Sequence, residues 1–147
     1  MSDQERLAER LRTSIGRFVR ATRLHADTLP PPLAESLGLL DREGDASTAT
    51  LAQRRGVRHQ SQSRTVKDLE ALGYVERRDD PHDRRGFLLT LTAQGRAALD
   101  RDREARSDWV AQAVEAVLKP DERAQLGVLP ELLDRLSDYD GGPSRAR

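Results

Sequence analysis

The sequence predicts a mainly α-helical fold with one small β-hairpin. Hydrophobic residues make up 36% of the chain and charged residues 34%, while aromatic residues make up 3%, a composition typical of helices that pack through leucine, valine and alanine. Long stretches at both ends carry apolar residues at helical spacing. Strand character is found only in the middle, where Tyr74–Arg77 and Phe87–Leu91 flank a turn-rich loop from Asp79 to Gly86.

A chain of 147 residues has the size of one domain and is long enough to bury a core. We expect one unit over residues 1–140 and a flexible tail over 141–147. The absence of cysteine excludes disulfides, thiolate metal sites and thiol-based redox switches. No apolar run approaches the roughly 20 residues that span a bilayer, and the start M-S-D-Q-E-R is not a signal peptide, so we expect a cytoplasmic protein without membrane contact.

The first third of the chain predicts two helices. From Glu5 to about Asp27 the apolar residues follow steps of four, four, three and one, which places them in one stripe: Leu7, Leu11, Ile15, Phe18 and Val19. The segment 28–32 is a connection, because its three consecutive prolines restrict the backbone. A second helix is expected from Leu33 to Arg42, ending at Gly44.

A helix-turn-helix is predicted between residues 47 and 73. Ser47 can cap the first helix, and Gly56 is the residue type favoured where a helix ends. The second helix comes next, over 57–73, and has an inner face of Val66, Leu69 and Leu72. Its first two turns are rich in donors and acceptors that suit base edges and phosphates: Arg58, His59, Gln60, Ser61, Gln62, Ser63 and Arg64.

An alternative to the helix-turn-helix is a simple amphipathic pair of helices with a solvated polar face. The residues that follow the two helices favour DNA binding, because Tyr74–Arg77 and Phe87–Leu91 predict two strands around the loop 79–86. Arg84 and Arg85 stand near the tip of that loop. A helix-turn-helix with such a β-hairpin after it is a winged helix.

The last third predicts two further helices. Thr92 can cap a long helix over 93–118, whose part from 100 to 106 has little apolar surface and is expected to be solvated. From Trp109 onward the same helix becomes apolar, which predicts burial. Pro120 begins a final helix, which Pro130 should kink and whose buried stripe is Leu126, Leu129, Leu133 and Leu136.

The net charge of zero is unevenly distributed. Residues 47–96 hold ten Lys or Arg against six Asp or Glu, a surplus of +4. Residues 97–140 hold six Lys or Arg against eleven Asp or Glu, a deficit of 5. Because attraction to phosphate depends on where the positive charge lies, the winged helix provides a basic face on a neutral chain.

The chain resembles the MarR family of dimeric winged helix-turn-helix transcription regulators. The resemblance lies in L-A-Q-R-R-G-V, then S-Q-S-R-T-V-K-D-L-E-A-L-G-Y-V-E-R, then D-P-H-D-R-R-G-F-L-L-T-L-T-A-Q-G. It implies a winged helix over about 33–96 and dimerisation helices over about 5–27 and 97–139 that interleave between two subunits. From the residues alone, a monomer that folds these terminal helices onto its own core remains an alternative.

By this resemblance the protein is a cytoplasmic repressor that binds double-stranded DNA as a homodimer. The operator is expected to be pseudo-palindromic, with half-sites about one duplex turn apart. A small anionic or phenolic effector, bound in a cleft between the dimerisation and DNA-binding parts, is expected to release the DNA. His25 is our candidate for that cleft, and the alternative is that it is simply a surface residue.

The predicted DNA contacts divide between the second helix and the wing. The candidates for the major groove are Arg58, Gln60, Ser61, Gln62 and Arg64. Ser61, Ser63 and Thr65 suit phosphates, and His59 belongs to the same set. In MarR-like proteins the position of Arg64 commonly contacts DNA. His59, Gln60 and Gln62 stand where small or hydrophobic residues often occur in the family, so which of them faces the groove stays open.

At the wing, Asp83 precedes Arg85 by two residues, which places both on one side of an extended strand. The carboxylate at that spacing can hold the guanidinium by two charge-assisted hydrogen bonds. The resemblance makes Arg85 the group offered to the minor groove, with Asp83 as its orienter and Arg84 as a phosphate contact. The alternative is a surface ion pair without a role in binding.

Enzyme chemistry and metal binding are not expected. His25, His59 and His82 lack the close spacing of zinc ligands, and no nucleophile elbow, phosphate-binding glycine loop or H-E-x-x-H motif is present. We therefore predict no cofactor, no metal and no catalytic residue. The rival function is a winged-helix protein-interaction module that does not bind DNA, and an enzyme dependent on His25 or His59 is a more distant one.

Overall fold

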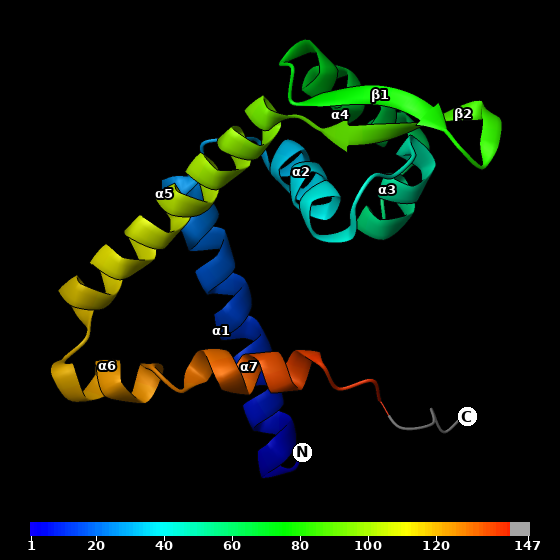
Figure 1. The fold of residues 1–147 in the computed structure, drawn as a ribbon. Coiled ribbons are helices and arrows are strands. Elements are labelled where there is room, and N and C mark those ends of the chain that lie inside the picture. The colour runs from blue at the N-terminus through cyan, green and yellow to red at the C-terminus, as the bar shows by residue number, and fades with distance from the viewer. Residues whose placement is uncertain (142–147) are drawn as a thin grey trace. The chain divides into compact units, whose positions relative to one another are not determined.

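Figure 1 shows the computed structural model, which describes residues 1–141. The mainly helical class with a small β-hairpin is confirmed, and the remaining residues of the predicted tail lie outside the described part. Residues 1–109 form one compact unit, and the described residues from 110 to 141 belong to a second. The elements are α1 (Asp3–Ala26), α2 (Pro31–Glu43), α3 (Thr48–Arg55), α4 (His59–Ala71), β1 (Val75–Asp80), β2 (Asp83–Leu91), α5 (Ala93–Val117), α6 (Pro120–Leu126) and α7 (Leu129–Ser137).

None of these helices combines the length and the apolar character that crossing a membrane requires. The described residues also contain no group of three or more His, Asp or Glu arranged to hold a metal ion.

The connection between α1 and α2 is held by a buried carboxylate from α5. Asp102 is fully buried and accepts hydrogen bonds from the backbone N–H groups of Thr28 at 2.8 Å and Leu29 at 3.0 Å. Its second oxygen lies 2.7 Å from the Arg106 guanidinium. The prediction that residues 100–106 are solvated is therefore wrong at Asp102. This carboxylate pairs the N–H groups of a connection whose prolines prevent helical hydrogen bonding.

The predicted helix-turn-helix is confirmed as α3 and α4. The Ser47 hydroxyl accepts the Thr50 backbone N–H at 3.1 Å, and Gly56 ends α3 with a φ of 65° in the left-handed region. Ahead of α3, the Ala46 carbonyl accepts the backbone N–H of Leu89 at 2.8 Å, so this linker pairs with β2. The core between these helices and the sheet contains four fully buried leucines: Leu37, Leu51, Leu69 and Leu89.

The hairpin strands are longer than predicted. β1 and β2 pair antiparallel, and only Pro81 and His82 remain in the turn between them. The predicted loop over 79–86 is therefore wrong in length. The register shifts between the Asp79–Phe87 and Asp80–Asp83 pairs, which leaves residues 84–86 as a bulge beside the turn. A bulge of this kind turns its side chains away from the regular alternation of a strand.

α5 begins as predicted, because the Thr92 hydroxyl accepts the backbone N–H of Gly95 at 3.0 Å. Further along α5, Arg96 and Arg103 donate to the two oxygens of Asp41 in α2 at 2.6 and 2.8 Å. The hydrogen bonds from Arg103 and Arg96 hold the pKa of Asp41 below its usual value. These contacts connect the first half of α5 to the helix that precedes the helix-turn-helix.

In the second unit, the helix predicted after residue 120 is interrupted. α6 ends at Leu126 and α7 begins at Leu129, with Pro130 in its first turn. The helix is therefore interrupted rather than kinked. Proline lacks the backbone N–H of a continuous helix, and its ring would clash with the carbonyl of the residue four positions earlier. The far half of α5 was expected to be buried, yet Val117 is 76% exposed and Val114 half-buried in the single chain.

Candidate nucleic-acid interface

The N-terminus of α4 is open to an incoming ligand. Arg58 occupies the N-cap position in an extended conformation and supplies no side-chain hydrogen bond to the first turn. The first N–H groups of a helix have no partner within the helix itself. Their partial positive charge, next to the Arg58 guanidinium, makes this end of α4 attractive to phosphate oxygens.

One exposed face of α4 carries the side chains best placed for DNA. Gln60, Arg64 and Lys67 are all exposed, and their spacing of four and three residues aligns them on that face. The acidic residues of α4, Asp68 and Glu70, lie in its last turns, so the positive charge lies toward the N-terminal end. Lys67 was not among the predicted contacts, although its spacing of three from Arg64 places it on the same face.

Gln62 does not face DNA, and the prediction that it lies in the major groove is wrong. Its side chain is fully buried. The side-chain amide of Gln62 donates to the Ser36 hydroxyl at 3.0 Å, and its carbonyl oxygen accepts from Arg55. Helical geometry explains this placement, because Gln62 precedes the buried Val66 by four residues and so lies on the inner face.

The other polar residues of this turn differ in their exposure. His59 and Ser61 are exposed, and Ser63 is half-buried. The Ser63 hydroxyl lies 3.3 Å from Nδ1 of His59, one turn earlier in the helix. The Ser61 backbone carbonyl accepts the Thr65 hydroxyl at 3.1 Å, which leaves the Ser61 side chain outside that contact and turns Thr65 inward.

At the wing tip, Arg84 and Arg85 are exposed within the bulge. The predicted contact between the Asp83 carboxylate and the Arg85 guanidinium is wrong. Oδ1 of Asp83 instead accepts the backbone N–H of Arg85 at 3.0 Å, a turn that aspartate commonly forms with the residue two positions later. Asp83 therefore holds the backbone at Arg85, and the Arg85 side chain is exposed.

The base of the wing is fixed to α4. The Arg77 guanidinium of β1 donates to both carboxylate oxygens of Glu70 in α4, with Nε at 3.1 Å from each and Nη2 at 2.9 Å from Oε1. The same guanidinium lies over the Phe87 ring of β2, 4.1 Å from its centroid. Arg77 thus joins the base of the wing to α4, and no local sequence pattern predicted this contact.

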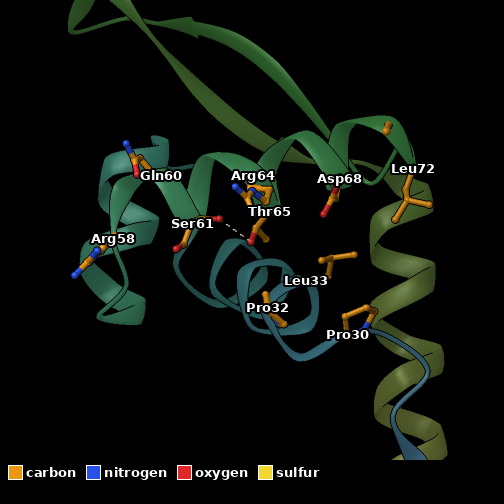
Figure 2. Close-up of a pocket in the computed structure, with 11 residues that line it drawn as sticks. Pro30, Pro32, Leu33, Arg58, Gln60, Ser61, Arg64, Thr65, Asp68 and Leu72 are labelled. Carbon is orange, nitrogen blue, oxygen red and sulfur yellow. Dashed lines mark hydrogen bonds between the residues drawn. The ribbon is translucent and has the colours of Figure 1, made fainter.

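A groove of about 790 Å³ runs between α4 and the start of α2 (Figure 2). Pro30 and Leu33 come from the side of α2, and Leu72 from the end of α4. Arg64 lines the same groove. His25 is not among the residues that line it, and the His25 ring instead stacks on Trp109 of α5 with ring centroids 5.4 Å apart.

The helix-turn-helix has a basic exposed face, and the β-hairpin that follows it has arginines at its tip. This combination defines a winged-helix DNA-binding protein. Residues 30–86 match the family model described as MarR family. An uncharacterised helix-turn-helix-type transcriptional regulator of Mycobacterium bovis is 30% identical over 140 residues, which cover 94% of this chain and 97% of the relative. The chain belongs to the MarR family and is a DNA-binding transcription regulator rather than an enzyme.

Solved structures agree with this assignment. A proposed transcriptional regulator from Pseudomonas aeruginosa has 29% sequence identity and a TM-score of 0.80, covering 95% of this chain and all of that one. The fold likeness extends to BpsR of Bordetella bronchiseptica, a protein whose DNA binding is regulated by 6-hydroxynicotinic acid. Its identity to this chain is 24% and its TM-score 0.60, with 95% of this chain and 99% of BpsR covered.

Proposed function

We propose that this regulator is a repressor that binds a pseudo-palindromic operator as a homodimer. The observation that carries the proposal is the set of exposed polar side chains on the N-terminal half of α4, next to a wing fixed to the same helix by Arg77 and Glu70. Repression is the expected result where the two half-sites overlap a promoter, because the bound dimer then blocks the polymerase.

Exposed apolar surface supports the dimer. In the first unit, the apolar stripe of α1 is exposed, with Leu7, Phe18 and Val19 at 65%, 51% and 41%. In the second unit, Leu132 and Leu136 of α7 are likewise exposed. Apolar surface arranged along one side of a helix is normally covered by a partner. A second copy of this chain supplies matching stripes.

We assign the DNA contacts by exposure and side-chain chemistry. Gln60 and Arg64 read bases in the major groove, because their amide and guanidinium groups pair with adenine and guanine through two hydrogen bonds. Arg85 enters the minor groove from the wing tip. Phosphate contacts come from the remaining exposed polar residues of the interface, together with the half-buried Ser63: Arg58, His59, Ser61, Lys67 and Arg84.

Titration of the protein against duplexes tests this assignment. The operator is first selected from a random duplex library with the wild-type protein, and affinity is then measured by anisotropy at several salt concentrations. We expect two chains per operator. Arg64→Ala should cost about 1–3 kcal/mol per half-site, which is about 5- to 150-fold for each half-site. Arg84→Ala removes one phosphate contact per chain, so with two chains bound it should weaken binding to all sequences alike and reduce the salt slope by about 2.

Arg101→Ala is the matched control, because Arg101 is exposed on α5 outside the interface. It should bind the operator as the wild type does. Wild-type protein that prefers no sequence over random DNA at any salt concentration would contradict the proposal and leave the protein-interaction module as the better interpretation.

We propose further that a small anionic or phenolic effector releases the DNA by binding in the groove beside α4. The volume of about 790 Å³ lies within the usual range of small-molecule sites. Leu33 and Leu72 offer apolar surface to an aromatic ring, and Arg64 offers a charge partner to an acidic group (Figure 2). An effector that pairs with Arg64 withdraws this side chain from the operator, so release needs no large movement.

A charge placed at the apolar end of the groove tests the effector proposal. Leu72 is 49% exposed and lies outside the proposed DNA contacts. Leu72→Glu should repel an anionic ligand, whereas Leu72→Gln keeps nearly the same shape without the charge. The operator affinity of each variant without effector is the baseline for its release. Release of wild-type protein from the operator is measured with 6-hydroxynicotinate and a panel of hydroxybenzoates. Equal release of both Leu72 variants would place the effector elsewhere.

A further inference from the structure

Buried polar side chains join α4, the proposed DNA-reading helix, to α2 and α3. Gln62 of α4 donates to the Ser36 hydroxyl of α2 at 3.0 Å and accepts from Arg55 of α3. Arg55, with 7% of its side chain exposed, also donates from Nε to the Glu35 carboxylate of α2 at 3.1 Å. Ser36 in turn donates to the Pro32 carbonyl at 2.8 Å. We call Glu35, Ser36, Arg55 and Gln62 the polar clamp.

The side-chain nitrogen and the side-chain oxygen of Gln62 each have a hydrogen-bond partner on another helix, Ser36 on α2 and Arg55 on α3. Gln62 and Ser36 are both fully buried, and the Arg55 side chain is 7% exposed, so the two hydrogen bonds of Gln62 lie in or next to the core. A buried polar group without a partner costs about 1–3 kcal/mol. Rotations of α4 that separate Gln62 from Ser36 or Arg55 are therefore disfavoured.

Apolar packing alone would not give this restriction. Val66 and Leu69 attach the same helix to the core, and both are buried. Apolar contacts are not directional, so they tolerate small rotations of a helix. Hydrogen bonds depend on distance and angle, so the two bonds of Gln62 select a narrow range of rotations.

Because of the position of Gln62 in α4, restricting the rotation of the helix also restricts the side chains on its proposed DNA-facing side. Gln62 lies two residues from Gln60 and two from Arg64, which corresponds to about 200° around the helix axis in either direction. Holding Gln62 inward therefore holds Gln60 and Arg64 outward. A rotation of α4 would move both side chains together relative to the bases.

We propose that the polar clamp fixes the rotation of α4 and so determines how sharply this protein discriminates between DNA sequences, although no clamp residue touches DNA. The inference rests on the proposed function of α4 as the helix that reads bases. Pairing with a base edge through two hydrogen bonds requires a defined side-chain position, whereas phosphate contacts carry no sequence information. Gln62 and Arg55 are thus positioning residues for discrimination.

Gln62→Met tests the proposal, because methionine has nearly the same length and volume but neither hydrogen bond. Affinity is measured for the operator selected by the wild-type protein, for random duplex, and for a panel of operators with one base pair changed at each position. We expect the preference for operator over random duplex to fall about tenfold, which corresponds to about 1.4 kcal/mol. Affinity for random duplex and the salt slope should stay at wild-type values, because the phosphate contacts remain.

The same substitution on the outer face is the matched control. Gln60→Met should relax the preference at the one or two base pairs that Gln60 reads. Gln62→Met should instead flatten the preference at several positions of each half-site, since it changes the placement of Gln60 and Arg64 together. A purely structural role of Gln62 would lower the unfolding temperature without producing this pattern.

Ser36→Ala is a second, independent test of the polar clamp if Gln62→Met does not fold. It removes one acceptor of Gln62 from α2, leaves α4 unchanged in sequence, and should flatten the preference in the same way. A folded Gln62→Met or Ser36→Ala protein with the wild-type preference at every position overturns the clamp while leaving the proposed function intact. Wild-type protein that selects no sequence overturns both.

Discussion

Asp102→Ala is expected to lower the free energy of unfolding by about 3 kcal/mol or more. The substitution leaves the buried backbone N–H of Leu29 and the partly buried N–H of Thr28 without their acceptor, and it removes the ion-pair partner of Arg106. Each unsatisfied buried donor costs about 1–3 kcal/mol. Equilibrium unfolding in urea measures the change, provided that protein concentration is held constant for a protein that forms dimers.

Asp100→Ala is the matched control for this prediction. Asp100 lies two residues earlier in α5, its side chain is 63% exposed, and its nearest charge partner is Arg103 at 3.9 Å. Its replacement should change stability by no more than about 0.5 kcal/mol. Equal effects of the two substitutions would show that the hydrogen bonds of Asp102 do not hold the connection between α1 and α2.

Features set by neighbouring residues could be predicted from the sequence. The caps at Ser47 and Thr92 and the helix end at Gly56 each depend on atoms within about one helical turn. The periodicity of α4 likewise places Val66 and Leu69 inside, although Leu72, which was predicted on the same inner face, is 49% exposed. The exposed positions of Gln60 and Arg64 in the candidate site could be derived from this local information.

Polar residues with distant partners could not be placed in this way. A helical pattern assigns polar side chains to solvent, yet Gln62 pairs with Ser36, 26 residues earlier in the chain. Asp102 pairs with Leu29, 73 residues earlier. Both contacts exist only because tertiary packing brings the helices together, and burial then makes each hydrogen bond obligatory.

The prediction for the wing failed for a different reason. A spacing of two residues places Asp83 and Arg85 on one side of a regular strand, but the bulge over 84–86 removes that regularity. A bulge depends on which residues pair across the hairpin, and the sequence of one strand does not specify that register. The place of the two arginines near the wing tip could be predicted from the sequence, but the contact between Asp83 and Arg85 could not.

Gly95→Ala is the second substitution with a large expected effect, a loss of about 3 kcal/mol. A Cβ atom at Gly95 would lie 2.1 Å from the backbone oxygen of Tyr74 and 2.9 Å from Cδ1 of Leu91. The Tyr74 oxygen cannot move away easily, because it also accepts the backbone N–H of Thr92 at 3.0 Å. Thermal and urea unfolding of the variant measure the loss.

The sign of this effect makes the prediction specific. Replacing a glycine inside a helix by alanine ordinarily stabilises a protein by about 0.5–1 kcal/mol. Gly16→Ala in α1 should obey that rule, since its nearest neighbour is the flexible Arg20 guanidinium at 3.3 Å. If both substitutions stabilise the protein, the close approach of α5 to Tyr74 does not exist in solution.

The close approach at Gly95 also bears on DNA binding. Tyr74 directly precedes β1, so the contact between Gly95 and the Tyr74 backbone sets where the wing leaves the core. A Gly95→Ala protein that still folds must shift either α5 or the start of the wing. Its operator affinity should fall, because Arg85 at the tip would then approach the duplex from a displaced hairpin. Measuring unfolding and operator affinity on the same variant separates this displacement from a general loss of folded protein.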